Sequence, residues 1–193
     1  MKYLAQPRIY LVSRPSVDWE QVAAFLSDED VPPIAESIRS GSEESSAIIE
    51  ISARLCYMSF GRGRKDITDF INNLLSSKDG SVLEHVNYGF VITGVSRSLT
   101  HELVRHRAGF AYSQRSQRYV DESDGSYVLP PALFHDKAEL DGVESIIKNA
   151  LEAASSSYEE LVSALDKAFP GDMFESNRDR RKAVRQAARA VLP

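Results

Sequence analysis

The chain has 193 residues, of which 42% are hydrophobic and 26% charged, and its formal net charge is -5. Both fractions lie near globular averages, which excludes a disordered or fibrous protein, and the length predicts one domain over residues 1–193. Cys56 is the only cysteine, which excludes an internal disulfide and a multi-cysteine metal site. No stretch approaches the ~20 apolar residues of a membrane span, and the first residues lack the apolar core of a secretion signal. We therefore expect a cytoplasmic protein without membrane contact.

The first half of the chain predicts one strand followed by helices. Residues 8–13 carry the β-branched and aromatic side chains of a strand. A short helix is expected over residues 18–27, and a polar surface connection over residues 27–46. Apolar residues then recur at helical spacing over 47–56, and residues 66–75 continue the pattern. These two stretches predict a pair of packed helices.

The middle of the chain predicts a strand that leads into a helix. Residues 87–95 alternate as in a strand that breaks at Gly94. Ser96 or Ser98 can then cap a helix that runs to about Arg107, and Gly109 is well placed to end it.

The last third predicts one further short strand and two helices. Residues 126–129 precede a pair of prolines and fit a strand. One apolar stripe extends without a break through residues 143–169 and predicts the longest helix. A basic helix should follow from about Asn177 to the end of the chain. The expected fold is therefore a single α+β domain, with a mixed or antiparallel sheet flanked by helices.

Positive charge is concentrated in two parts of an otherwise acidic chain. Five arginines fall between Arg97 and Arg118, and six basic residues fall between Arg178 and Arg189. Two basic patches on an acidic protein favour a small anionic ligand over a nucleic-acid polymer. Arginine forks bind phosphate or carboxylate in bidentate fashion, so a phosphate ligand is the natural hypothesis. A solvated basic surface, with Glu102 as an internal ion-pair partner, is the open alternative.

The spacing of the polar residues predicts how they face. Glu102 and Arg105 are three residues apart and should share one face of the predicted helix. In an extended segment, Gln114, Ser116 and Arg118 would point to one side and the two residues between them to the other.

The order of the residues also resembles a known family. Arg105 to Arg107 read Arg-His-Arg, and residues 112–119 read Tyr-Ser-Gln-Arg-Ser-Gln-Arg-Tyr, which is similar to the signature of flavin-dependent thymidylate synthases. Residues 81–85 (Ser-Val-Leu-Glu-His), 53–57, 96–103 and 185–193 also resemble segments of that family. The resemblance covers most of the chain from about Ala53.

This resemblance implies an activity and an assembly. It implies a fold like that of the thymidylate synthase-complementing proteins and the reductive methylation of dUMP to dTMP. The cofactor would be FAD, with NADPH and methylenetetrahydrofolate as co-substrates, and the subunits of a homotetramer would share each active site. Members normally continue past the segment that here ends at Pro193, so we expect the usual C-terminal segment to be missing.

The resemblance also implies roles for particular residues. The expected FAD-binding residues are Ser81, Glu84, Arg105, His106 and Arg107. The expected dUMP-binding residues are Glu102, Gln114, Arg115, Ser116, Gln117, Arg118 and Arg185, with Arg118 and Arg185 as phosphate ligands. No metal ligand and no protein nucleophile are expected; Ser116 is the candidate for a hydroxyl that activates the substrate. Cys56, on an apolar helical stretch, is interpreted as a buried structural residue.

Two other hypotheses remain at this point. The chain could be a divergent or inactive relative that binds flavin or nucleotide without completing methylation. It could also be an RNA- or DNA-binding module that uses its basic helices, although the acidic net charge disfavours polymer binding.

Overall fold

The computed structural model describes residues 2–32, 43–134 and 142–193. The chain divides into two compact units. The first unit comprises Met1–Ile9 and Ile92–Pro193, and the second comprises Tyr10–Val91. In the described parts of both, no helix combines the length and the apolar character that a membrane crossing requires.

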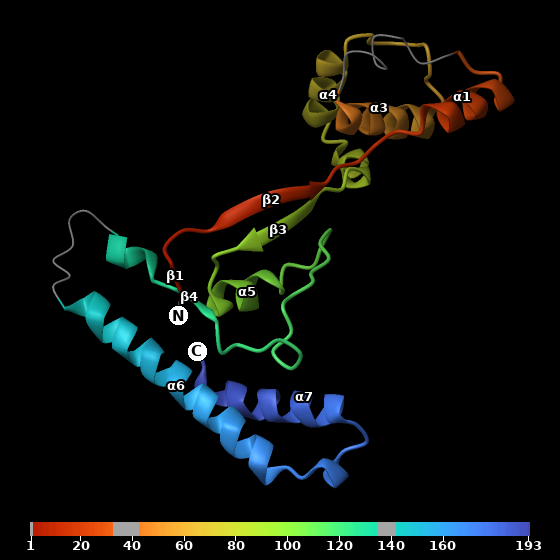
Figure 1. The fold of residues 1–193 in the computed structure, drawn as a ribbon. Coiled ribbons are helices and arrows are strands. Elements are labelled where there is room, and N and C mark those ends of the chain that lie inside the picture. Colours follow the sequence, from red (N-terminus) through yellow and green to blue (C-terminus); the bar gives the residue numbers. More distant parts are fainter. Residues whose placement is uncertain (1, 33–42, 135–141) are drawn as a thin grey trace. The chain divides into compact units, whose positions relative to one another are not determined.

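Helices dominate the second unit (Figure 1). They are α1 (Trp19–Asp28), α3 (Glu44–Tyr57) and α4 (Ile67–Ser76), followed by the 3₁₀ turn η1 (Gly80–His85). Side-chain caps begin two of them: Asp18 accepts from the backbone N–H of Gln21 at 3.1 Å, and Asp66 accepts from that of Asp69 at 2.9 Å. The three predicted helices are confirmed, while the surface connection predicted over residues 27–46 lies partly outside the described residues.

Two small apolar clusters stabilise the second unit. One joins Leu26 of α1, Ala47 of α3 and Phe60, with Trp19 packed against it. The other joins α3, α4 and η1 through Ala53, Leu74 and Val82. Since burying a large apolar side chain contributes roughly 1.5–3 kcal/mol, these clusters fix α1, α4 and η1 against α3.

A buried ion pair lies on the same helix. Arg54 Nε donates to Glu50 Oε1 at 2.6 Å, and both residues are buried. The remaining guanidinium donors reach three carbonyl oxygens of the following loop, those of Ser59, Arg62 and Arg64, at 2.7–2.9 Å. Burial raises the pKa of Glu50, and the hydrogen bond and charge of Arg54 oppose that rise. The pair therefore ties the loop to α3.

Cys56 does not lie on the buried face of α3, so the prediction that it is buried was wrong. The buried side of the helix runs through Ala47, Glu50 and Arg54. Cys56 is two residues beyond Arg54, roughly 200° around the helix. The prediction assumed that only apolar side chains occupy the buried face of this helix, whereas Glu50 and Arg54 also lie there.

The strands of the described segments form two two-stranded sheets. β2 (Arg8–Ser13) pairs with β3 (Gly89–Thr93), and β1 (Lys2–Leu4) pairs with β4 (Ser126–Val128). β1 and β4 are parallel, with Tyr3 opposite Tyr127. The strands expected at 8–13, 87–95 and 126–129 are confirmed, and so is the α+β class. β1 was not predicted, and the single domain over residues 1–193 stays a prediction.

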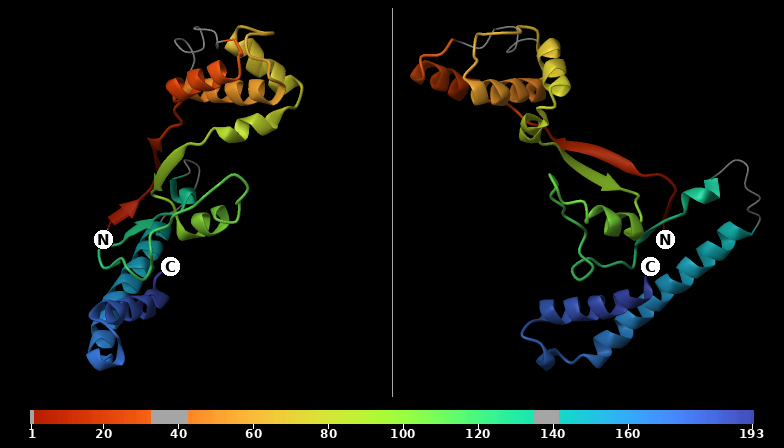
Figure 2. Two further views of the ribbon diagram at one scale, coloured as in Figure 1. Left: turned by 90° about the vertical axis from the view of Figure 1, so that its right-hand side faces the viewer. Right: turned by 180° about the vertical axis from the view of Figure 1, so that it is seen from behind.

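In its described residues, the first unit contains three α-helices (Figures 1 and 2). They are α5 (Arg97–Leu103), α6 (Val143–Ala168) and α7 (Asn177–Ala188), which is followed by the 3₁₀ turn η4 (Arg189–Val191). The two helices α6 and α7 pack side by side. Tyr158 of α6 and the pair Val184 and Ala188 of α7 are almost fully buried. The long helix predicted over 143–169 is confirmed, and the basic helix ends at Ala188, short of the predicted end.

The helix after Gly94 also ends earlier than expected. Ser96 is its cap, accepting from the N–H of Leu99 at 3.2 Å, and Gly94 has a positive φ of 69° that accommodates the turn before it. The helix was predicted to reach Arg107 but ends at Leu103. The N–H groups of Arg105 and His106 bond to carbonyls three residues back instead of four, which tightens and terminates the helix.

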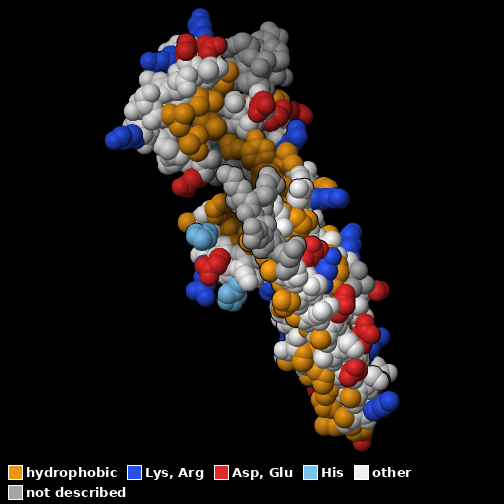
Figure 3. Space-filling view, turned by 90° about the vertical axis from the view of Figure 1, so that its left-hand side faces the viewer, with side chains coloured by type: hydrophobic (Ala, Val, Ile, Leu, Met, Phe, Trp, Pro, Cys, Tyr) orange, Lys and Arg blue, Asp and Glu red, His pale blue; other side chains and the backbone are white. Residues whose placement is uncertain are grey.

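Both units leave large hydrophobic side chains on their surfaces. Ile9 and Ile146 of the first unit are 68% and 69% exposed, and Tyr57 of the second is 77% exposed. On the face drawn in Figure 3, hydrophobic side chains gather in patches between the charged ones.

Candidate functional site

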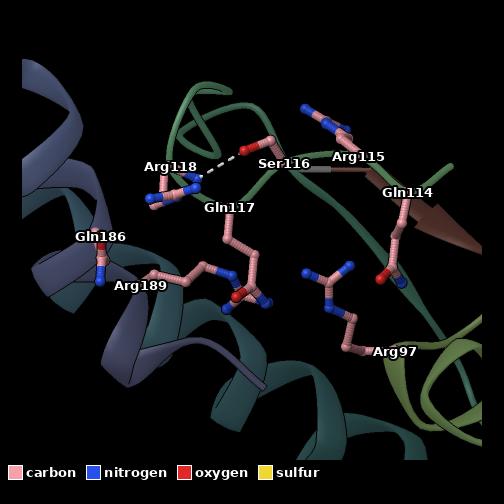
Figure 4. Close-up of a pocket in the computed structure, with 8 residues that line it drawn as sticks. All are labelled: Arg97, Gln114, Arg115, Ser116, Gln117, Arg118, Gln186 and Arg189. Carbon is pink, nitrogen blue, oxygen red and sulfur yellow. Dashed lines mark hydrogen bonds between the residues drawn. The ribbon is translucent and has the colours of Figure 1, made fainter.

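A pocket of about 400 Å³ in the first unit gathers positively charged side chains (Figure 4). Its walls come from the start of α5, from the segment 114–118, and from the end of α7 with the turn after it. The lining residues are Arg97, Gln114, Arg115, Ser116, Gln117, Arg118, Gln186 and Arg189. Four of these eight are arginines and none is acidic, so the pocket is suited to an anion.

Local hydrogen bonds shape the segment 114–118. Gln114 Nε2 donates to Thr100 Oγ1 of α5 at 2.5 Å, which holds the start of the segment against that helix. Ser116 then begins a turn: its hydroxyl accepts from the N–H of Arg118 at 3.3 Å, and its carbonyl from that of Val120 at 3.3 Å. Side-chain bonds of this kind commonly replace extended backbone by a turn.

Because of this turn, the predicted alternation of side chains was wrong. An extended segment would have sent Arg115 and Gln117 away from Gln114, Ser116 and Arg118. All five line the same pocket instead.

Arg97 and Gln117 connect two walls of the pocket. With the amide oxygen of Gln117 turned toward Arg97, it accepts from Nε at 3.0 Å and from Nη2 at 2.6 Å. The orientation of a side-chain amide is assigned from its hydrogen bonds. In this orientation the amide oxygen of Gln117, an acceptor, faces the donors of Arg97. The guanidinium of Arg97 is thereby held at the pocket wall.

One of the two terminal nitrogens of Arg189 has no acceptor among the residues that the structure describes. Its Nη2 donates to the carbonyl oxygen of Pro193 at 3.0 Å. Its Nη1 is buried, and no group in the described part of the chain accepts from it. An unsatisfied buried donor costs about 1–3 kcal/mol, more when charged, and Arg189 is one of the four arginines that line the pocket.

Arg118 belongs to a second group of cations beside the pocket. The charged ends of Arg118, Arg178 and Lys182 lie 5.9, 5.4 and 5.3 Å from the centre of the Tyr119 ring. These are cation–π distances. The two basic patches recognised in the sequence therefore meet at Tyr119.

Two of the residues expected to bind dUMP do not line the pocket. Glu102 is exposed in the last turn of α5. Arg185 donates from Nη1 to the carbonyl oxygen of Tyr119 at 2.8 Å and from Nη2 to Asp121 Oδ2 at 3.1 Å. The other five expected residues, 114–118, are brought together.

The pocket is also lined by three residues for which no individual role was predicted, Arg97, Gln186 and Arg189. A signal for two of them was present. Arg189 follows Arg185 by one helical turn, so both share one side of α7 and its continuation, and Gln186 is the adjacent position. Arg97 was counted in the first basic patch, but its place in the pocket wall depends on the packing of α5.

The residues expected to bind FAD are divided between the two units. Arg105, His106 and Arg107 are exposed in the turn after α5, and their side chains make no hydrogen bond or ion pair with other described residues. Tyr112 fixes this turn by donating its hydroxyl to the carbonyl of His106 at 2.9 Å. Ser81 and Glu84 are exposed on η1 of the second unit. The grouping of these five residues in one site stays a prediction.

We expect Asp121→Asn to lower stability at neutral pH but not in acid. The hydrogen bond from the Ser123 hydroxyl, followed by the backbone bond from Ser123 and the charge of Arg185, lowers the pKa of Asp121, while burial opposes this. A carboxyl group whose pKa is lowered by folding stabilises the folded state at pH values above its unfolded pKa. This stabilisation is lost as pH falls through the folded pKa. Denaturant midpoints measured against pH should therefore begin to converge for the two proteins as pH falls below about 4. A gap that does not change with pH would contradict this assignment.

Comparisons with known proteins give the family. The family model for the thymidylate synthase complementing protein matches residues 38–193. A flavin-dependent thymidylate synthase of Mycobacterium sp. (strain KMS) is 41% identical over 198 residues, which cover 100% of this chain and 71% of that relative. One of Mycobacterium tuberculosis is 41% identical over 175 residues, covering 88% of this chain and 64% of that relative. The resemblance found in the sequence is confirmed, together with membership in a group of enzymes. The chain belongs to the thymidylate synthase complementing protein family.

Proposed function

We propose that this protein catalyses the reductive methylation of dUMP to dTMP. The cofactor is FAD, methylenetetrahydrofolate is the one-carbon donor and NADPH is the reductant. The observation that carries the proposal is the pocket whose lining includes four arginines and no acidic residue. A nucleotide phosphate supplies the acceptors that this pocket needs.

The pocket residues divide into two roles in this proposal. Arg118 and Arg189 bind the phosphate of dUMP, and the charge of Arg97 and Arg115 adds to the attraction. Arg115 is already paired with Glu122 at 3.4 Å, and its side chain is 58% exposed, so we assign it the weaker share. Gln114, Ser116 and Gln117 carry the polar groups that can orient a uracil ring.

Ser116 is the candidate group for activating the substrate. Its hydroxyl accepts from the N–H of Arg118, which leaves its own proton free to donate. A hydroxyl donor beside a uracil carbonyl stabilises negative charge that develops on that oxygen. No covalent role is assigned to the protein, and the residues that line the pocket include no cysteine.

The flavin is assigned to the residues after α5 and on η1. The exposed side chains of Arg105, His106 and Arg107 offer several donors in a row, which fits the phosphates of a flavin dinucleotide. Ser81 and Glu84 complete the proposed set. A bound flavin would supply the redox chemistry, while the protein binds and orients the substrate. Glu102 remains in the proposed substrate set, and the proposed assembly is a homotetramer.

The decisive experiment uses the purified protein. We expect yellow protein with a flavin absorbance spectrum, NADPH oxidation that depends on dUMP, and formation of dTMP when methylenetetrahydrofolate is added. Binding of FAD and dUMP without dTMP formation would favour the divergent, inactive relative. Absence of both ligands, together with salt-sensitive binding to mixed oligonucleotides, would favour the nucleic-acid-binding module.

A further inference from the structure

The side chain of Arg185 makes its hydrogen bonds to other residues of the chain, although it lies next to the pocket. Nη1 donates to the carbonyl oxygen of Tyr119 at 2.8 Å, and Nη2 donates to Asp121 Oδ2 at 3.1 Å. Both terminal nitrogens of the planar fork therefore have acceptors on one short segment. The side chain is partly buried, with 27% exposed, and it is absent from the residues that line the cavity.

The contact joins two walls of the pocket. Tyr119 and Asp121 directly follow the wall segment 114–118, while Arg185 precedes Gln186 and lies one turn before Arg189. A bond between Arg185 and residues 119–121 therefore sets how far Arg118 stands from Arg189.

Further bonds hold the same short segment, so that it is a firm anchor. Asp121 Oδ1 accepts from the N–H of Ser123 at 3.1 Å and from its hydroxyl at 2.7 Å. The N–H of Glu122 donates to the hydroxyl of Tyr158, a buried residue of α6, at 3.3 Å. The segment is thus fixed to α6 and α7, which pack against each other.

We propose that Arg185 is a positioning residue that clamps the segment 119–121 to α7 and so fixes the spacing of the anion-binding arginines, and that it is not itself a ligand of the substrate. The identification of the ligand as dUMP rests on the proposed function. The clamp requires a fork, because one side chain must reach two acceptors. A lysine keeps the charge but cannot make both bonds in this geometry.

The test compares Arg185→Ala, Arg185→Lys and Asp121→Ala with Arg181→Ala. Arg181 is an exposed arginine of α7 that makes no hydrogen bond or ion pair with other described residues, so it controls for lost charge. Hydrogen–deuterium exchange is followed at the amides of Arg118, Val120 and Glu122, and dUMP affinity is measured by calorimetry. We expect about 5-fold faster local exchange and about 5-fold weaker dUMP binding in the first three variants, the size of one partly exposed ion pair. The control should match the wild type in both.

The double variant Arg185→Ala with Asp121→Ala should lose no more affinity than either single variant, because both remove the same clamp. Two results would overturn the proposal: near wild-type dUMP affinity in Arg185→Lys beside a large loss in Arg185→Ala, or unchanged exchange at residues 118–122. Wild-type protein that does not bind dUMP would refute the proposed function, while the exchange measurement would still decide the role of Arg185.

Discussion

Replacing Arg54 with alanine is expected to destabilise the protein by about 3–5 kcal/mol, the usual cost of removing one partner of a buried ion pair. The substitution leaves Glu50, which is 1% exposed, without its cation. It also removes the donors that bind the carbonyls of Ser59, Arg62 and Arg64. Denaturant unfolding at pH 8 measures the loss.

The loss should be smaller at pH 5 than at pH 8. Burial already raises the pKa of Glu50, and Arg54 opposes that rise. Without Arg54 the pKa of Glu50 in the folded protein rises further. A group whose pKa is raised by folding destabilises the folded state least at low pH, where it is protonated in both states, and most as pH increases through the folded pKa. Protonation in acid removes the uncompensated buried charge.

Arg64→Ala is the matched control for Arg54. Arg64 is an exposed arginine of the same loop, and only its carbonyl takes part in the bonds to Arg54. Its substitution removes the same charge but should change stability by no more than about 0.5 kcal/mol. A loss below about 1 kcal/mol for Arg54→Ala would show that the pair contributes little.

Arg118→Ala should weaken dUMP binding by about 100-fold or more while FAD binding stays near the wild-type level. Losing a charged partner of a bound phosphate typically costs about 2–5 kcal/mol, and 2.7 kcal/mol corresponds to about 100-fold. Arg118 lines the pocket and has no acidic partner among the described residues. Titration of dUMP by calorimetry and of FAD by absorbance separates the two affinities.

Two further variants serve as comparisons for Arg118→Ala: the conservative variant Arg118→Lys and the control Arg181→Ala. The lysine variant keeps the charge without the fork and should recover part of the affinity. Arg181→Ala removes an exposed charge of α7 and should bind dUMP normally. Unchanged dUMP affinity in Arg118→Ala would refute the assignment of this residue to the phosphate.

The sequence predicted those elements whose signals are local. The apolar stripe of α6 extends over 26 residues, and Ser96 caps α5 as expected. The end of α5 was missed because its last turn tightens through backbone hydrogen bonds to carbonyls three residues earlier. No residue type in this stretch predicts that change. β1 has three residues and pairs with β4 more than 120 residues away, so its formation depends on a long-range contact that a local pattern does not contain.

The same distinction applies to the candidate site. Residues 114–118 were found because they are contiguous and carry the family signature, although the turn at Ser116 reversed the expected facing of two of them. Arg97 and Arg189 come from distant parts of the chain, and they meet only because α5 and α7 pack into the first unit. Arg185 belonged to the expected set, yet its partners, Tyr119 and Asp121, could not be read from spacing.

The single tryptophan makes the second unit observable by itself. Trp19 packs against the cluster of Leu26, Ala47 and Phe60, and the chain has no other tryptophan. The fluorescence emission of Trp19 therefore changes when that cluster opens to water. Binding of dUMP reports instead on the pocket in the first unit. Recording both along one denaturant titration would show whether the protein melts in one cooperative step or in two.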